Sequence, residues 1–437
     1  MRRKKTKASE RVNLQNLPML NPDAAGIDVG AKQHLVAVPA DRDPRPVRTF
    51  QAFTPQLHEL AAWLKRCGIR TVALESTGIY WLSLYEVLEQ DGLEVRVVNA
   101  RHVKHVPGRS KTDVLDCQWI QKLHSFGLLN GSFRPDPPIR KLRTYLRLRD
   151  NLVVNNTQAI HHLQKALFEM NVQLSNVISD VSGETGLRII EAIIAGERNP
   201  EQLAALCSSR IKASRETVAK SLHGNWDSAL LHCLKTALET YHFTHCQIQE
   251  CDLCIQRQLA ELDARAPLPD SAASLKEQLH RVCGVDLTKI PGIKEQAAQI
   301  IISEVGLDMT KWNTEKQFSA FLGLSPDNRI SGGKVLSRST RKVYNRAADT
   351  LRLSAQSLTH SKSALGAKYR RLKARLGAPK AIVAMAHHLA RLVYRMLRYG
   401  QNYVEKGIEH YERKFRLQRI KWLKKEARAL NLQLVAA

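Results

Sequence analysis

Four acidic side chains occupy positions from which they can serve phosphodiester chemistry. Asp28 stands inside the apolar run 26–30, and Glu75 directly follows the run 71–74. Asp113 and Asp116 are three residues apart in a helical pattern, so they share one helix face. Carboxylates brought together repel one another unless a divalent cation lies among them, and such oxygen ligands suit Mg²⁺ or Mn²⁺. Together the four predict a metal-dependent site, although each one alone can equally cap a turn, end a strand or cap a helix.

A serine in a basic segment is the second candidate group. Ser331 precedes Gly332 and Gly333, so the backbone beside it can approach a substrate closely. A serine hydroxyl that attacks a phosphodiester must lose its proton, and the charge on the phosphorus oxygens must be neutralised. On spacing alone, an ordinary loop serine explains the residue better than a nucleophile does. The basic residues expected to contact nucleic acid here are Arg329, Lys334, Arg338, Arg341, Lys342 and Arg346.

The elements that must position the carboxylates read as an α/β domain. Short β patterns at 26–30, 34–38 and 47–50 precede helix, strand, helix, strand and helix patterns, the last over 111–126. This order is that of a ribonuclease-H-like (RuvC-like) fold, a mixed sheet flanked by helices, in which the first and fourth strands are neighbours. Asp28 and Glu75 then project from one sheet edge. A doubly wound nucleotide-binding domain is the alternative, but no glycine-rich phosphate loop follows the first strand.

The rest of the chain reads as mainly helical. Apolar residues from Leu142 to Leu167 recur at steps of 4, 7, 7, 3 and 4, which predicts a coiled-coil helix with a partner from this chain or another. The segment 290–293 resembles the turn of a helix-hairpin-helix element, whose glycine lets backbone N–H groups approach a phosphate. We therefore expect a basic tail (1–22), the RuvC-like domain (23–135), a helical connector (136–270), a C-terminal domain with the serine (271–400) and a basic helical tail (401–437).

Composition restricts the class of partner. The chain has 437 residues, and 67 lysines and arginines against 41 acidic residues give a net charge of +26. This excess favours a polyanionic partner over a small neutral substrate. Eight cysteines without a regular spacing indicate a reducing compartment, and no apolar run is long enough to predict a membrane helix. We therefore expect a cytosolic protein.

The order of these motifs resembles the transposases of the insertion sequence 110 (IS110) family. The resemblance rests on Asp28, Glu75, the motif 111–116 (KTDVLD), the turn 290–293 and the motif 331–334 (SGGK). It implies a RuvC-like DEDD domain followed by a transposase domain with a nucleophilic serine. It also implies a bridge RNA, encoded by the element, that pairs with donor and target DNA. The family's tetramer, a dimer of dimers, brings the acidic centre of one subunit to the serine of another.

The resemblance assigns roles to the candidate residues. Asp28, Glu75, Asp113 and Asp116 become metal ligands and Ser331 the covalent nucleophile of a DNA transposase or recombinase. Its expected partners are donor and target DNA, a guide RNA and further copies of the chain, with no membrane. The expected location is the bacterial cytoplasm, with action at the nucleoid. Two alternatives remain: a junction-resolving nuclease that uses metal alone, and a non-enzymatic scaffold that binds nucleic acid.

Overall fold

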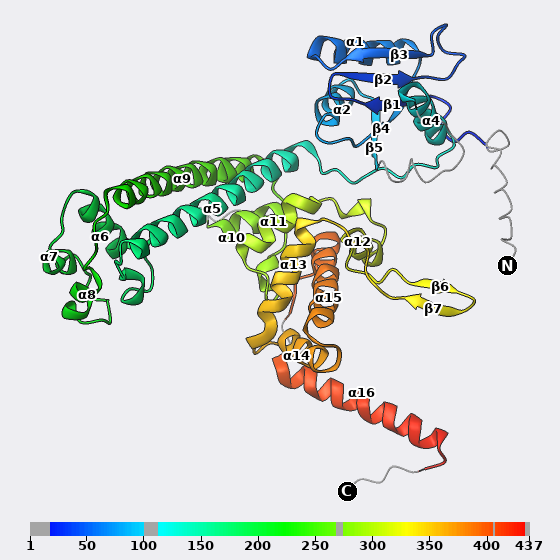
Figure 1. Ribbon diagram of the computed structural model, residues 1–437. Coiled ribbons are helices and arrows are strands. Elements are labelled where there is room, and N and C mark those ends of the chain that lie inside the picture. Colours follow the sequence, from blue (N-terminus) through cyan, green and yellow to red (C-terminus); the bar gives the residue numbers. More distant parts are fainter. Residues whose placement is uncertain (1–17, 100–111, 268–273, 405–406, 433–437) are drawn as a thin grey trace, which may run out of the picture. The chain divides into compact units, whose positions relative to one another are not determined.

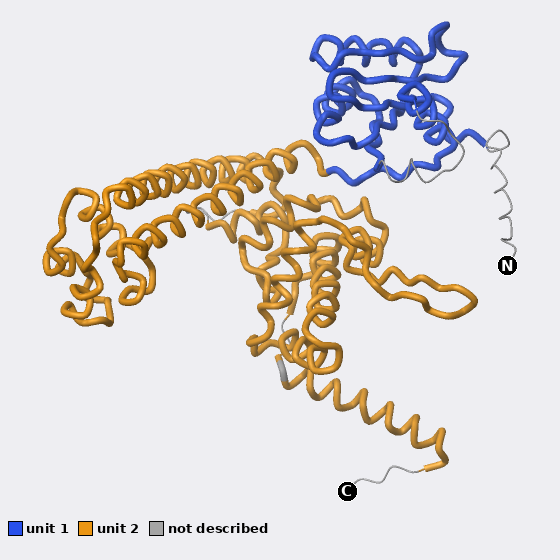
Figure 2. The backbone as a smooth tube through the Cα atoms, viewed as in Figure 1, with its two compact units in different colours: residues 1–134 blue, residues 135–437 orange. Residues whose placement is uncertain are grey.

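The computed structural model describes residues 18–99, 112–267, 274–404 and 407–432 (Figure 1). The chain divides into two compact units, Met1–Arg134 and Pro135–Ala437 (Figure 2). Most of the predicted basic tail, and Lys111 at the start of the predicted helix 111–126, lie outside the described residues. The expected boundaries near residues 270 and 400 stay predictions. Over the described residues, no helix combines the length and the apolar character needed to cross a membrane.

The first unit is built on a five-stranded mixed sheet of order β3-β2-β1-β4-β5. β1 pairs antiparallel with β2 and parallel with β4, so the predicted contact between the first and fourth strands is confirmed. The remaining pairs are β2 with β3, antiparallel, and β4 with β5, parallel. The bounds are β1 (Ala24–Val29), β2 (Gln33–Ala37), β3 (Val47–Gln51), β4 (Thr71–Glu75) and β5 (Glu94–Val98).

Helices cover both faces of this sheet because its strands alternate between two apolar sets. On one face Ile27 and Leu74 pack with side chains of α1 (Thr54–Arg66) and α2 (Trp81–Gln90). On the other face Ala73 packs with Ile120 of α4 (Asp113–Ser125). Asp28 and Glu75 alternate with Ile27 and Leu74, so both belong to the face that α4 covers. The Thr112 hydroxyl caps α4 by accepting a hydrogen bond from the Leu115 amide.

The second unit begins with a pair of long helices, α5 (Pro137–Glu169) and α9 (Ser228–Glu261). Arg149 pairs with Asp252, and the Thr244 hydroxyl donates to Asn156, so residue numbers rise along one helix as they fall along the other. The helices are therefore antiparallel, and the partner that the α5 seam requires comes from the same chain. The seam residues Leu142, Leu146, Leu163 and Leu167 are buried, whereas Val153 is 38% exposed.

Shorter helices complete the second unit. α6 (Glu184–Ile194), α7 (Pro200–Ala205) and α8 (Arg215–Ser221) lie between the two long helices in sequence. After α9 come α10 (Leu275–Cys283), α11 (Glu295–Val305), α12 (Glu315–Phe321), α13 (Arg346–Ser357), α14 (Ala364–Leu376), α15 (Ala378–Tyr399) and α16 (Gly407–Ala429).

The turn before α11 is pressed against another helix. Gly292 has a φ of +92°, and a Cβ at this position would lie 2.5 Å from the carbonyl oxygen of Ser354 in α13. Ile290 and Ile293 on either side are buried. Glycine is needed here for packing within the unit. The expected phosphate contact of a helix-hairpin-helix element stays a prediction.

Candidate active site

The sheet places two of the predicted carboxylates side by side. The parallel pairing of β1 with β4 aligns Ile27 with Leu74, so the next residues, Asp28 and Glu75, lie level on neighbouring strands. Both occur where their strands end, and residues level on parallel strands point to the same face. Glu75 is only 9% exposed. Among the described residues, no side chain or backbone amide donates a hydrogen bond to its carboxylate.

The direction of α4 brings the other two carboxylates to the same edge. Gln121 donates from its side chain to the carbonyl oxygen of Ala24 (3.3 Å), and His124 hydrogen-bonds Thr71 (2.9 Å). The end of α4 therefore lies over the beginnings of β1 and β4. Its first turn, with Asp113 and Asp116, lies toward the ends of these strands, where Asp28 and Glu75 are.

A glycine allows this close approach. A Cβ at Gly26 would lie 2.1 Å from the amide nitrogen of Gln121 and 2.5 Å from the carbonyl oxygen of Cys117. Real side chains do not reach such distances, so the α4 backbone rests directly on β1. Gly26 and Asp28 share a face of β1, and the glycine thereby sets the height at which the acidic helix passes the strand.

The pKa of the Cys117 thiol responds to the charges of the nearby carboxylates. The pKa of this thiol is raised to about 11, chiefly by burial and in smaller part by the charges of Asp28 and Asp113. Both carboxylates are therefore close to the same side chain. Cys117 was not among the residues predicted from the sequence. Its place one residue after Asp116, on the face that meets the sheet, was the available signal.

The four carboxylates share an edge but do not surround one point. Within the described ranges, no group of three or more His, Cys, Asp or Glu side chains is close enough to hold a metal ion. The donor set fits a hard cation in its chemistry, because all four ligands are carboxylates. The nearly buried Glu75 carboxylate fits as well, since it receives no hydrogen bond within the described residues. Asp28, Glu75, Asp113 and Asp116 are thus the residues that would hold Mg²⁺ or Mn²⁺.

Ser331 lies at the tip of a hairpin made of β6 (Arg329–Ser331) and β7 (Lys334–Ser337) (Figure 1). It pairs with Lys334, and the two residues between them, Gly332 and Gly333, have φ of 54° and 74°. Two successive positive φ values define the tight turn that matches the twist of a hairpin, and glycine adopts them without strain. Ser331 is exposed, and no third strand joins this sheet in the described chain.

The six predicted basic residues fall into two groups. Arg329, Lys334 and Arg338 are exposed on or next to the hairpin, and Lys342 is exposed beyond it. Two others hold the hairpin's base to the unit. Arg341 donates to the carbonyl oxygen of Ala320 (2.6 Å), and Arg346 forms an ion pair with Asp150 of α5. Burial and the nearby Arg147 charge lower the pKa of Arg346.

Two family models match this chain. A model for the DEDD transposase domain of IS110 matches residues 25–172, and one described as "Transposase IS116/IS110/IS902 family" matches residues 286–370. The chain belongs to the IS110 family of transposases. It is also 23% identical, over 317 residues, to the transposase for insertion sequence element IS1111A of Coxiella burnetii (strain RSA 493 / Nine Mile phase I). That alignment covers 71% of this chain and 73% of the relative.

Family membership settles the class of activity. The chain is an enzyme that cuts and rejoins DNA, and DNA is its partner. The first match contains the four carboxylates, and the second contains Ser331. The mixed α/β first unit and the mainly helical second unit are consistent with a DEDD nuclease-like fold. Transposase domains of this kind generally use a divalent metal.

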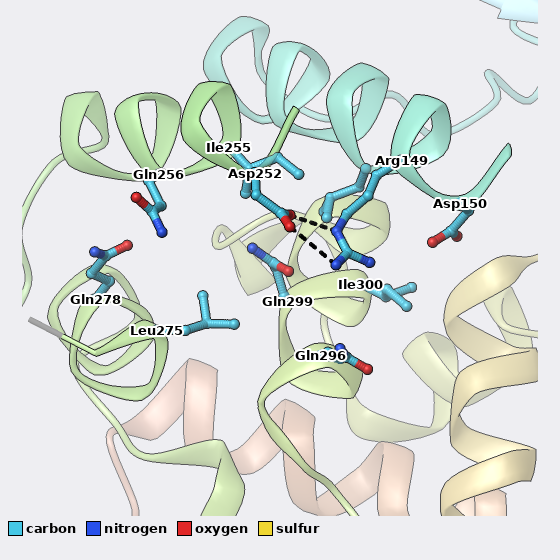
Figure 3. A pocket seen from close by; sticks show the side chains of 11 residues that line it. Arg149, Asp150, Asp252, Ile255, Gln256, Leu275, Gln278, Gln296, Gln299 and Ile300 are labelled. Atoms are coloured by element: carbon cyan, nitrogen blue, oxygen red, sulfur yellow. Dashed lines mark hydrogen bonds and ion pairs between the residues drawn. The ribbon is translucent and has the colours of Figure 1, made fainter. Parts of the chain in front are cut away.

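A cavity of about 260 Å³ with both polar and apolar side chains in its lining lies in the second unit, between α5, α9, α10 and α11 (Figure 3). Arg149 and Asp252 face each other across it in a two-fold hydrogen-bonded pair, at 2.5 and 3.2 Å. Gln256, Gln278 and Gln299 also line it. None of the predicted site residues belongs to its lining. Asp150, the partner of Arg346, does, so the cavity adjoins the contact that anchors α13.

Proposed function

We propose that this IS110-family transposase cuts DNA by covalent catalysis, with Ser331 as the nucleophile. The observation that carries the proposal is the position of Ser331 at an exposed hairpin tip, paired with Lys334 and followed by two glycines. A nucleophile must reach a phosphorus atom inside a bulky duplex, and a narrow projecting hairpin is suited to that approach. The flanking Arg329 and Arg338 supply positive charge for the phosphate oxygens.

The proposed step balances as a transesterification. The Ser331 Oγ forms a bond to phosphorus while one phosphorus–oxygen bond to a deoxyribose breaks. The serine proton leaves, and the released sugar oxygen takes up a proton. Rejoining reverses this exchange: a sugar hydroxyl of another DNA end attacks the phosphoserine and frees the serine. The phosphodiester energy is kept in the covalent link, so rejoining requires no nucleotide cofactor.

The acidic edge has the supporting role in this proposal. We propose that the first unit is a RuvC-like domain in which Asp28, Glu75, Asp113 and Asp116 hold Mg²⁺ or Mn²⁺. A bound divalent ion supplies Lewis-acid neutralisation of charge on phosphate oxygens. The protein's own contribution is to hold four carboxylates at one sheet edge through the alignment of β1 with β4 and the direction of α4.

Adduct formation tests the serine directly. The chain is incubated with Mg²⁺ and DNA carrying the element's ends, denatured, and examined for protein bound covalently to DNA. Ser331→Ala should abolish the adduct and strand cleavage and leave DNA affinity within about twofold. Ser337→Ala is the matched control, because this hydroxyl belongs to the opposite strand of the same hairpin, where Ser337 pairs with Arg329. Its adduct should persist.

The same experiment separates the alternatives. Cleavage without any adduct, unchanged by Ser331→Ala but lost with Asp116→Asn, would identify a metal-only junction-resolving nuclease. Absence of cleavage with every natural element end would favour a binding scaffold over the proposed chemistry.

We also propose that an element-encoded RNA guides the reaction and that several copies of the chain form the working assembly. The large net charge of +26 supports a second polyanion besides DNA. The exposed apolar side chains of the hairpin, Ile330 (62%) and Leu336 (70%), support its burial against another surface during catalysis. Copurification with and without the element's flanking non-coding DNA tests the RNA partner.

A further inference from the structure

The helix α16 carries a basic face, which the exposed side chain of Leu417 interrupts between Lys414 and Lys421. With 3.6 residues per turn, six of its basic side chains fall within an arc of about 120°, and its three acidic residues fall outside it. From the first to the last of these basic residues the face extends about 22 Å along the helix at 1.5 Å per residue. The six are Arg413, Lys414, Lys421, Lys424, Lys425 and Arg428.

None of these six side chains has an ion-pair partner within the described part of the chain. The only carboxylate of α16 that pairs with a described residue is Glu412, whose partner is Arg371 of α14 (3.5 Å). By contrast, lysines on other surface helices of this unit are neutralised locally. Lys165, Lys220 and Lys235 each lie within 4 Å of a glutamate one turn away, at 3.7, 2.7 and 3.9 Å. The α16 face is therefore an uncompensated row of positive charge.

Aromatic contacts hold the beginning of this helix in place. The Arg371 guanidinium lies over the rings of Phe415 (3.8 Å) and Tyr411 (5.4 Å). These two rings lie on a different side of α16 from the basic face. Residues 416–426 are all exposed, and Figure 1 shows this half of α16 extending beyond α14. The helix is thus anchored at one end, with its basic face open to a partner.

The positive charge continues from α16 into the body of the unit. Lys368 of α14 is half-buried and has no hydrogen-bond or ion-pair partner among the described residues. Burial lowers its pKa, and so do the nearby charges of Arg391 on α15 and Lys414 on α16. Arg391 is paired with Glu315, so the positive charges without a described partner where the basic face begins are Lys368 and Lys414. Two like charges held close together favour an external anion beside them.

We propose that the basic face of α16, together with Lys368, binds the sugar–phosphate backbone of duplex DNA. Lysine and arginine rows of this kind position a protein on DNA without reading its sequence. The proposal rests on family membership, which makes DNA the partner. It does not depend on the serine chemistry, because backbone binding persists whether or not Ser331 reacts.

Replacing three of the lysines tests the proposal in the full chain. Affinity for a fluorescent 30-base-pair duplex of arbitrary sequence is measured by anisotropy between 50 and 200 mM salt. Log affinity decreases as log salt concentration rises. In the triple variant Lys421→Gln, Lys424→Gln, Lys425→Gln, the magnitude of this slope should be smaller by about 3. Glutamine is a good helix former, so helical circular dichroism should be unchanged.

The matched control removes the same charge from elsewhere. Lys165→Gln, Lys220→Gln, Lys235→Gln also takes three charges from surface helices of the second unit, but at positions already paired with glutamate. Its salt slope should stay within 1 of that of the unchanged chain. Equal losses in the two triple variants would overturn the proposal. So would a loss confined to an RNA duplex of the same sequence, or retained DNA affinity with altered self-association.

Discussion

At the scale of single residues, the acidic edge depends on Glu75, a carboxylate that receives no hydrogen bond from the described part of the chain. Glu75 is 9% exposed, and no described residue donates to its carboxylate. A divalent cation bound beside this carboxylate would interact favourably with its charge. Metal binding should therefore appear as added stability, because any ion that binds only the folded state raises its melting temperature.

We predict that 5 mM Mg²⁺ raises the melting temperature of the chain and that Glu75→Gln removes this effect. Without metal, the Glu75→Gln variant should be at least as stable as the unchanged chain, since the buried charge is gone. Differential scanning calorimetry with and without EDTA measures both. Glu59→Gln, at an exposed position of α1, is the control and should keep the magnesium response. An undiminished response in Glu75→Gln would exclude this residue as a ligand.

Gly26 controls the same edge by its lack of a side chain. We predict that Gly26→Ala destabilises the chain by about 3 kcal/mol, because a Cβ there would overlap the α4 backbone. Cleavage should fall as well, since α4 carries Asp113 and Asp116. Urea denaturation measures the first effect. Gly131→Ala is the matched control: its Cβ would lie 3.6 Å from the nearest atom, an ordinary contact, and it should change the unfolding free energy by less than about 1 kcal/mol.

At the scale of elements, the α5 seam separates residues that have the same apolar character in the sequence. Leu163 is fully buried against neighbouring helices, but Val153 is 38% exposed. We predict that Leu163→Ala costs about 3 kcal/mol of unfolding free energy and Val153→Ala less than about 1 kcal/mol. Chemical denaturation followed by circular dichroism measures both. Equal costs would mean that the two helices pack in a different register.

An ion pair joins α12 to α15. Arg395 donates to Glu315 (2.5 Å), as does Arg391 (2.8 Å), and both guanidinium groups lower the pKa of Glu315 to about 2. A lowered pKa stabilises the fold above the ordinary value of 4.5 and loses this effect as the pH falls toward 2. We predict that Glu315→Gln costs about 1 kcal/mol at pH 7.

The pH dependence of this stability loss shows whether the charge of Glu315 causes it. The difference in unfolding free energy between the unchanged chain and Glu315→Gln should be constant from pH 7 to about pH 5.5 and should shrink between pH 4.5 and pH 2. Urea titrations across this range measure it. A difference that does not change with pH would attribute the effect to packing instead of charge.

The sequence predicted helices and strands well where the spacing of apolar residues distinguishes one from the other. The strands, the α4 helix and the neighbouring positions of β1 and β4 follow from apolar alternation and from the order of elements along the chain. The β6–β7 hairpin was not predicted, because its strands are short and exposed on both faces and carry no apolar alternation. The partner of α5, the Asp150–Arg346 pair and the α4 contact at Gly26 join residues far apart in sequence, which periodicity does not reveal.

At the scale of the whole molecule, the carboxylates and the serine belong to different units, which the fold builds independently. If the working site is completed by a second copy, two inactive variants should complement each other. We predict that mixing Ser331→Ala with Asp116→Asn restores cleavage that neither shows alone, to about a quarter of the activity of the unchanged chain when subunits exchange freely. A gel assay of strand cleavage measures it. Labelled chains verify that subunits have exchanged. If cleavage does not recover after exchange, the carboxylates and the serine of one working site belong to the same copy.

The antiparallel α5–α9 pair has a consequence for how this enzyme can change in length. The length of an α-helical hairpin is set by the number of residues in its two arms. Removing seven residues from each arm at matched positions shortens the hairpin by about 10 Å and keeps the phase of its supercoil. The α6–α8 tip would then keep its orientation and change only its reach. An unmatched deletion would rotate that tip by a large part of a turn. Natural relatives should therefore differ here by paired, heptad-sized steps, and engineered enzymes with a shorter or longer hairpin can be made in the same way.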